Sequence, residues 1–62
     1  MRMIGMGLLV YKTPTFIREE HTQIGLFFRA GTGTAYFETD VDEDDGEEFI
    51  VGRYYEFKIQ LA

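Results

Sequence analysis

TQIGLFFRAGTGTAYFETDV, residues 22–41, is the most informative stretch for the fold, because its pattern predicts two paired strands. In residues 22–30, the side chains of Ile24, Leu26 and Phe28 alternate with those of Phe27, Arg29 and their neighbours. An alternation with a period of two is typical of a strand that buries one face. We therefore expect a strand over residues 22–30, with its even-numbered side chains in the core.

The short connection between the two strands sets their predicted register. Gly31–Thr32 suits a two-residue type II′ turn, in which glycine takes the first position. This turn places Phe28 opposite Ala35 and Leu26 opposite Phe37 on the apolar face. A slip of one residue would turn charged side chains toward the core, so burial favours the register that we predict.

The flanking segments predict further strands and one short helical turn. Residues 3–11 alternate as a first strand, and residues 49–61 alternate as a long last strand that bends at Gly52 and leaves Arg53 exposed. Thr13 and Pro14 are typical of a helix start, which predicts a helical turn near residues 14–20. An extended loop is the alternative for this segment.

The whole chain, residues 1–62, is expected to form one small all-β domain. We predict a curled antiparallel sheet or barrel of four to five strands, SH3-like or OB-like, with a flat meander covered by a second chain as the alternative. A chain of 62 residues buries too little surface for a large core, and the lack of cysteine excludes disulfides. We therefore expect a homo-oligomer, in which a second copy adds stability.

Composition also bears on location and activity. The lack of cysteine and of any run near the ~20 apolar residues that cross a bilayer predicts a cytoplasmic protein without membrane contact. His21 is the single histidine, and the chain contains neither serine nor cysteine, so the usual nucleophilic triads are absent. We expect no enzymatic activity, and nothing in the sequence indicates a cofactor.

The second informative stretch is acidic: ETDVDEDDGEE, residues 38–48, holds eight acidic residues and no basic one. The rest of the chain carries six basic residues against three acidic ones, and the net charge is −5. A two-residue turn at Asp45–Gly46 would set like charges opposite each other, so we predict a wide loop over residues 42–47. The candidate partner-binding residues of this loop are Asp42, Glu43, Asp44, Asp45 and Glu47.

The same stretch is similar to a calcium-binding loop only in part. Asp40, Asp42 and Asp44 have the spacing of that loop, but Asp45 stands where its glycine belongs. The twelfth position would be Val51, which has no carboxylate to bind calcium. We therefore predict no metal site here.

A second candidate site combines aromatic and basic side chains. Phe27 and Tyr36 are expected opposite each other on the face away from the main core, with Arg29 on the same face and Tyr54 nearby. Clustered exposed aromatic rings indicate a binding surface, and arginine binds phosphate or carboxylate. We select Phe27, Arg29, Tyr36, Arg53 and Tyr54 as residues of a subunit interface or of a site for a small anionic ligand such as a nucleotide.

These features predict a non-enzymatic interaction module that acts on a protein partner through the acidic loop and the aromatic sheet face. The net negative charge disfavours nucleic acid as a partner. The alternative is a homo-oligomeric binder, or sponge, of a small anionic ligand. FIVGRYYEFKI, residues 49–59, resembles the closing strand of many small β-domains, including phage accessory proteins. A small acidic single-domain protein would also suit a phage-encoded inhibitor of host defence, which we keep as an example of the alternative although no motif indicates it.

Overall fold

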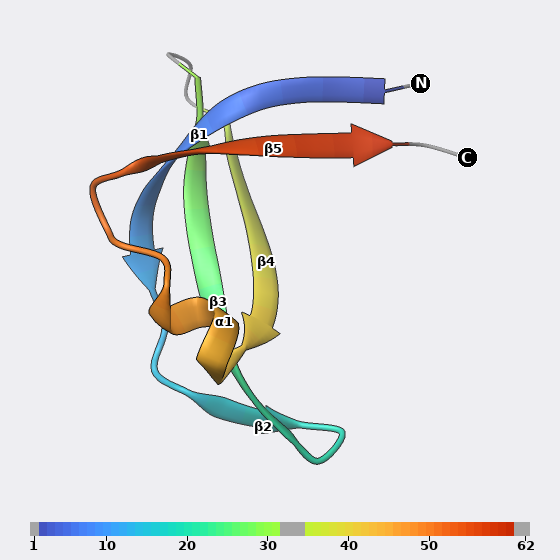
Figure 1. The fold of residues 1–62 in the computed structure, drawn as a ribbon, viewed down its shortest axis with the longest axis vertical. Coiled ribbons are helices and arrows are strands. Elements are labelled where there is room, and N and C mark those ends of the chain that lie inside the picture. Colours follow the sequence, from blue (N-terminus) through green and yellow to red (C-terminus); the bar gives the residue numbers. More distant parts are fainter. Residues whose placement is uncertain (1, 32–34, 61–62) are drawn as a thin grey trace.

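The described part of the chain forms one antiparallel sheet of five strands with a single short helix (Figure 1). The computed structural model describes residues 2–31 and 35–60, and for residues 2, 3, 59 and 60 it describes the backbone alone. The sheet is curled but not closed, so the all-β prediction is confirmed in its sheet form. The elements are β1 (Arg2–Lys12), β2 (Phe16–Arg18), β3 (His21–Ala30), β4 (Tyr36–Asp42), α1 (Glu43–Glu47) and β5 (Tyr54–Gln60).

Strand β3 is the centre of the sheet. It pairs with β4 along one edge, and with β2 and then β1 along the other. Gln23 shows this arrangement, because it is paired with Phe16 of β2 and with Asp42 of β4 at once. Strand β5 pairs with the far edge of β1. Within the described residues, the outer edges of β4 and β5 therefore have no strand partner.

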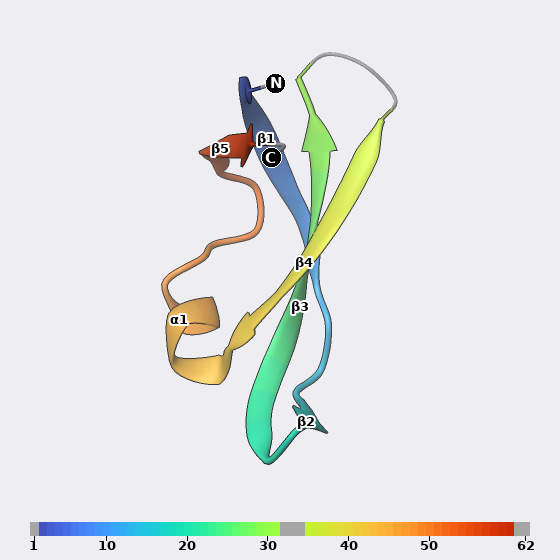
Figure 2. The same ribbon diagram turned by 90° about the vertical axis from the view of Figure 1, so that its right-hand side faces the viewer.

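The core lies on one face of this sheet. Leu9, Leu26 and Phe28 are buried there, and five half-buried side chains pack around them: Ile24, Phe37, Val41, Phe49 and Tyr55. The rings of Phe28 and Phe37 stack with their centroids 5.0 Å apart. Helix α1 and strand β5 both lie on the same side of β3 and β4 (Figure 2). The predicted inward face of residues 22–30 is thus confirmed.

The predicted register between the two central strands is wrong by two residues. Phe28 lies opposite Phe37, and Leu26 lies opposite Thr39. The Ala30 N–H donates to the Ala35 carbonyl at 2.8 Å, so the connection between these strands spans residues 31–34. A shift by two keeps every side chain on its face, which is why the inward face was correct although the pairing was not. Thr32 of the predicted turn lies outside the described residues.

A β-bulge at Val10 changes the outward face of β1. Leu9 pairs with Phe28, but Tyr11 pairs with Phe27, so one residue of β1 has no partner between them. Leu9 therefore lies in the core while Tyr11 is carried to the opposite face. Simple alternation places Leu9 and Tyr11 on one face, and this expectation is wrong because the bulge adds a residue.

The long last strand expected over residues 49–61 begins later than predicted. Arg53 N–H donates to the Ile50 carbonyl at 3.2 Å, and Gly52, with φ of +95°, is the third residue of this turn. A positive φ at that position favours glycine. The chain does change direction at Gly52, and Arg53 is exposed as predicted, but the segment before Tyr54 is a turn and not a strand.

The segment near residues 14–20 forms a strand hairpin, so the predicted helical turn is wrong. Strand β2 pairs with the start of β3, and Glu19 and Glu20 make the turn with φ of 50° and 69°. Two successive positive φ values are typical of a type I′ hairpin turn. Pairing with the open edge of β3 satisfies backbone groups that a helix of seven residues would satisfy poorly.

Candidate interaction surfaces

Helix α1 occupies the acidic stretch, where the sequence predicts a wide loop. Its buried residue Gly46 packs on β3 and β4: a Cβ at this position would overlap Cγ2 of Ile24 and lie 3.5 Å from Cγ2 of Val41. Glycine thus lets the helix backbone lie directly on two core side chains. The loop prediction is wrong because this contact anchors the segment to the sheet.

The acidic side chains suit the start of this helix. Glu43, Asp44 and Asp45 form its first turn, where negative charge interacts favourably with the helix dipole. The last turn closes as Phe49 N–H donates to the Gly46 carbonyl at 3.2 Å. Phe49 then packs against the core, and β4 leads directly into the first residue of α1, so both ends of the helix are fixed to the sheet. The buried residue of α1 is Gly46, and the acidic side chains lie on its other faces.

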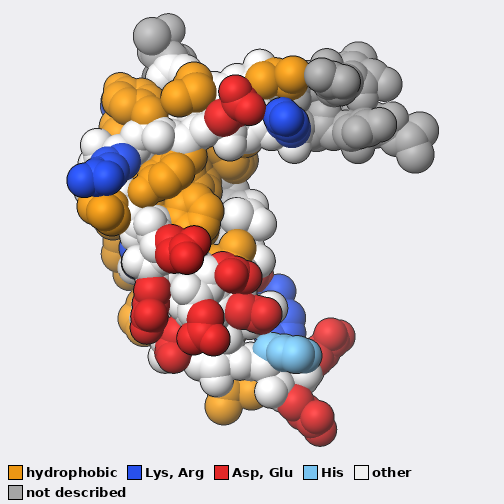
Figure 3. All heavy atoms as spheres, in the orientation of Figure 1, with side chains coloured by type: hydrophobic (Ala, Val, Ile, Leu, Met, Phe, Trp, Pro, Cys, Tyr) orange, Lys and Arg blue, Asp and Glu red, His pale blue; other side chains and the backbone are white. Residues whose placement is uncertain are grey.

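The predicted partner-binding residues gather at one end of the molecule. Glu20, which the sequence did not predict to lie near them, joins them there. Figure 3 shows the acidic side chains grouped over this region, next to the histidine. A hollow of about 280 Å³ brings Glu20 of the β2–β3 turn together with the start of α1; its lining is Glu20, His21, Thr22, Asp42, Glu43 and Asp44. We call Glu20, Asp42, Glu43, Asp44, Asp45 and Glu47 the acidic end. The described residues contain no group of three or more His, Cys, Asp or Glu placed to hold a metal ion.

The second predicted surface is a row of side chains that crosses four strands. Tyr54 of β5 lies opposite Leu8 of β1, Leu8 lies opposite Arg29 of β3, and Arg29 lies opposite Tyr36 of β4. Cross-strand partners share a face, and this face is opposite to the core. We call these four residues the aromatic row.

The two tyrosines of the aromatic row are open to solvent. Tyr54 and Tyr36 are 57% and 63% exposed, and Ile4 and Met6, on the same face of β1 as Leu8, are 51% and 48% exposed. Isolated exposed apolar side chains are ordinary, but neighbouring ones on one sheet face make that face a candidate interaction surface. The register therefore assembles an apolar outer face, of which the sequence predicted only a part.

Two of the five selected residues lie outside the aromatic row. Phe27 is opposite Glu38, not Tyr36, and its ring packs on Tyr11 with centroids 5.8 Å apart. Arg53 accepts a hydrogen bond from Leu9 N–H at 3.0 Å, which places it opposite a core residue and off the aromatic row. Arg29, Tyr36 and Tyr54 are brought together, whereas Phe27 borders the row and Arg53 does not belong to it.

Arg29 has an unusual environment within the row. It is half-buried, and its Nε atom is shielded from solvent without a hydrogen-bond partner among the described residues. The described part of the chain also gives it no ion pair within 4.0 Å. A shielded donor without a partner is unfavourable by ~1–3 kcal/mol.

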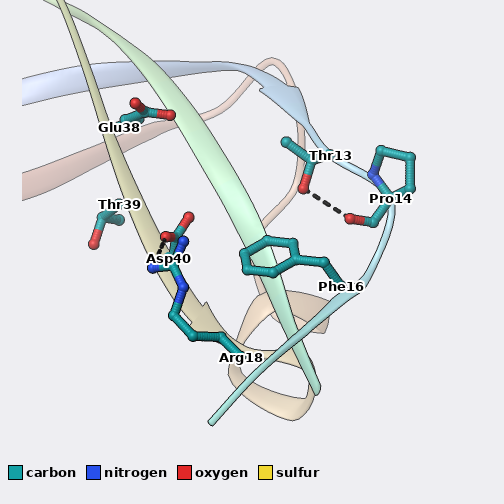
Figure 4. A pocket seen from close by; sticks show the side chains of 7 residues that line it. All are labelled: Thr13, Pro14, Phe16, Arg18, Glu38, Thr39 and Asp40. Atoms are coloured by element: carbon teal, nitrogen blue, oxygen red, sulfur yellow. Dashed lines mark hydrogen bonds and ion pairs between the residues drawn. The ribbon is translucent and has the colours of Figure 1, made fainter. Parts of the chain in front are cut away.

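A polar groove on the outer face was not found from the sequence. Arg18 reaches from β2 across β3 to Asp40 of β4, with 2.7 Å between Nη1 and Oδ2 (Figure 4). Because Gly25 of β3 has no side chain, the side chains of Thr13 and Asp40 can approach its backbone closely. The Gly25 N–H donates to Oγ1 of Thr13 at 2.8 Å. The groove, of about 420 Å³, is lined by Thr13, Pro14, Phe16, Arg18, Glu38, Thr39 and Asp40. Gly25, a glycine inside a predicted strand, was the one feature of the sequence that could have indicated this groove.

An apolar cleft opens on the core side, between β4 and β5. It has a volume of about 170 Å³ and is lined by Leu26, Phe28, Phe37, Thr39, Phe49, Tyr55, Glu56 and Phe57. The rings of Phe37 and Phe57 meet across it with centroids 4.7 Å apart. The hollow exists because the sheet is not closed between these two strands.

None of these three hollows is lined by Phe27, Arg29, Tyr36, Arg53 or Tyr54. The residues selected for a small anionic ligand thus lie on an open sheet face or apart from one another, outside those hollows. Comparison of the chain with protein-family models, with curated proteins and with solved structures finds no match. In the described part of the chain, no helix has the length and apolar character to cross a bilayer.

Proposed function

We propose that this protein is a non-enzymatic module that binds another protein through its outer sheet face and its acidic end. The observation that carries the proposal is the aromatic row. Two tyrosines and their apolar neighbours are about half exposed on a sheet face, in a chain whose described core has three buried apolar side chains. Tyrosine and arginine are among the residues that contribute most energy to protein interfaces.

The acidic end supports a partner with a basic surface. The side chains of α1 point away from the core, and Glu20 extends the same charge to the neighbouring hairpin. Charge of one sign at the edge of a contact surface raises the rate of association with an oppositely charged partner. In this proposal the aromatic row holds the partner and the acidic end orients it, and the module acts by occupying the partner's surface.

A photo-crosslinking amino acid placed at Tyr36 tests the proposal in the cells that make the protein. The matched control is the same amino acid at Ile17, which is 77% exposed on β2 and lies outside the aromatic row. We expect an adduct with one protein from position 36 and none from position 17. The captured protein, once purified, should bind the wild-type chain in calorimetry and bind Y36S/Y54S at least tenfold more weakly, with I17S unchanged. Equal capture from both positions would contradict the proposal.

A homo-oligomeric binder or sponge of a small anionic ligand, such as a phage-encoded inhibitor of host defence, stays a prediction from the sequence. Native mass spectrometry of protein purified from its own cells separates it from our proposal. A multimer that retains a nucleotide would support the sponge. A monomer, or a complex with a second protein and no ligand, would favour the interaction module.

A further inference from the structure

The outer edge of β4 has backbone groups that no described strand pairs with. Ala30 donates its N–H to Ala35, which sets the alternation of hydrogen bonds along the pair with β3. Residues 37, 39 and 41 thus direct their backbone groups toward β3. The intervening Tyr36, Glu38 and Asp40 direct theirs away from the sheet, where no described strand meets them. An open row of N–H and C=O groups is a template for an added strand.

The two faces of β4 differ in a way that specifies the added strand. On the outer face, Glu38, Asp40 and Asp42 are all exposed, and Asp40 alone has an ion pair, with Arg18, among the described side chains. On the core face, Phe37 and Thr39 line the apolar cleft. Side chains of a strand alternate between its two faces. In a strand added beside β4, the side chains on the outer face would therefore lie next to carboxylates, and those on the core face would lie next to the apolar cleft.

The cleft has the size of side chains and not of a free ligand. Its volume of about 170 Å³ lies below the ~300–1,000 Å³ of typical small-molecule pockets. Five aromatic rings line it, and the one charged residue in its lining is Glu56. Large apolar side chains from a strand beside β4 would fill it without leaving polar groups unsatisfied.

Charge argues against a second copy of this chain at the same edge. Pairing β4 with another β4 would place the carboxylates at positions 38, 40 and 42 opposite or diagonal to one another. Like charges across a strand pair are destabilising. A partner segment with lysine or arginine at the same positions forms favourable pairs instead.

We propose that the outer edge of β4 binds an extended segment of a partner protein in which basic residues alternate with large apolar residues. The segment adds a strand to the sheet, pairs its basic side chains with Glu38 and Asp42, and inserts its apolar side chains into the cleft between β4 and β5. This inference rests on the proposed function and specifies the chemistry of the partner.

Three synthetic peptides of seven residues test the site on the full chain. The first alternates Lys with Val and Leu, the second has the same composition with all its Lys at one end, and the third replaces Lys with Glu. We expect the first alone to bind, measured by fluorescence anisotropy, and to shift the amide signals of Glu38 and Asp40 in two-dimensional NMR. Equal binding of the second peptide, or unshifted β4 amides, would overturn the proposal.

Backbone methylation separates strand addition from attraction between charges. In an extended peptide, alternate N–H groups point to opposite edges. N-methyl groups on every second residue of the first peptide therefore remove the hydrogen-bond donors of one edge and leave those of the other. Methylation of the edge that meets β4 should abolish binding, and methylation of the other edge should leave it unchanged. In the protein, Glu38→Lys should weaken binding about fivefold to tenfold, since it turns an attractive cross-strand pair into a repulsive one. Glu19→Lys, the same charge change on the β2–β3 turn, is the matched control, and an equal effect there would overturn the proposal.

The outcomes also distinguish this site from the proposed function. If the protein captured through position 36 binds without shifting the β4 amides, the strand site is refuted while the interaction module stands. If the alternating peptide binds as described but position 36 captures no protein, the proposed function fails and the strand site stands. Concentration-dependent dimers with shifted β4 amides would assign the edge to a second copy and overturn the proposal.

Discussion

Replacing Gly46 with alanine is expected to destabilise the fold, against the usual preference for alanine in helices. The added Cβ would overlap Cγ2 of Ile24, well inside the ~3.5–4.0 Å at which two carbon atoms attract each other. Helix α1 must then move off the sheet, or Ile24 must leave its rotamer. Such overpacking is unfavourable by about 1–3 kcal/mol.

The helix preference of alanine offsets only part of this loss. Glycine is about 1 kcal/mol less favourable than alanine in a helix interior. Because the overlap is severe, we take the upper part of the overpacking range, and the net loss in the free energy of unfolding is about 1–2 kcal/mol. A domain of this size loses about 4–8 °C of melting temperature for each kcal/mol.

Urea and thermal unfolding followed by circular dichroism measure this loss directly. The partner variant is Ile24→Ala, which removes the methyl group that the new Cβ would meet. In a double-mutant cycle, the Gly46→Ala change should cost at least about 1 kcal/mol less in the Ile24→Ala background. If Gly46→Ala alone is as stable as the wild type or more stable, α1 does not rest on Ile24 and the account of the acidic end is wrong.

Further predictions concern the hairpin, the aromatic row and the first strand. Changing Glu19 to Asn and Glu20 to Gly should raise the free energy of unfolding by about 1 kcal/mol, because both positions have positive φ; an unchanged urea midpoint would refute this turn. Arg29→Met should raise the melting temperature by several degrees, since it removes a shielded donor without a partner, and lowered stability would show that the arginine supports the fold. Gly7→Val should lower the free energy of unfolding by about 1–3 kcal/mol, because a Cβ there lies 3.1 Å from Cζ of Phe37; a neutral effect in thermal melts would contradict the close packing of β1.

The candidate surfaces were only partly predictable from the sequence. Arg29, Tyr36 and Tyr54 could be chosen because each is an aromatic or basic residue on an alternating strand. Leu8 could not, because its place between Tyr54 and Arg29 depends on how β1 pairs with two other strands. The polar groove and the apolar cleft likewise arise between strands that are distant in sequence.

The acidic stretch shows the same division. Its charge and its separation from the basic residues were evident from the sequence, and so was the unfavourable geometry of a two-residue turn at Asp45–Gly46. That Gly46 belongs to a helix that packs on the sheet was not evident, because the reason is the position of Ile24 on a neighbouring strand. From the sequence alone, a glycine within an acidic run predicts a turn. Only the contact with Ile24 shows why a helix forms there instead.

The sequence by itself determined the strand content, the inward face of β3 and the exposure of Arg53, because a period of two and a glycine turn are local properties of the backbone. The pairing of Phe28 with Phe37, the bulge at Val10 and the position of α1 followed only from the folded molecule. They depend on which rings stack, which backbone groups meet and where a missing Cβ leaves room, and no short stretch of sequence contains those contacts.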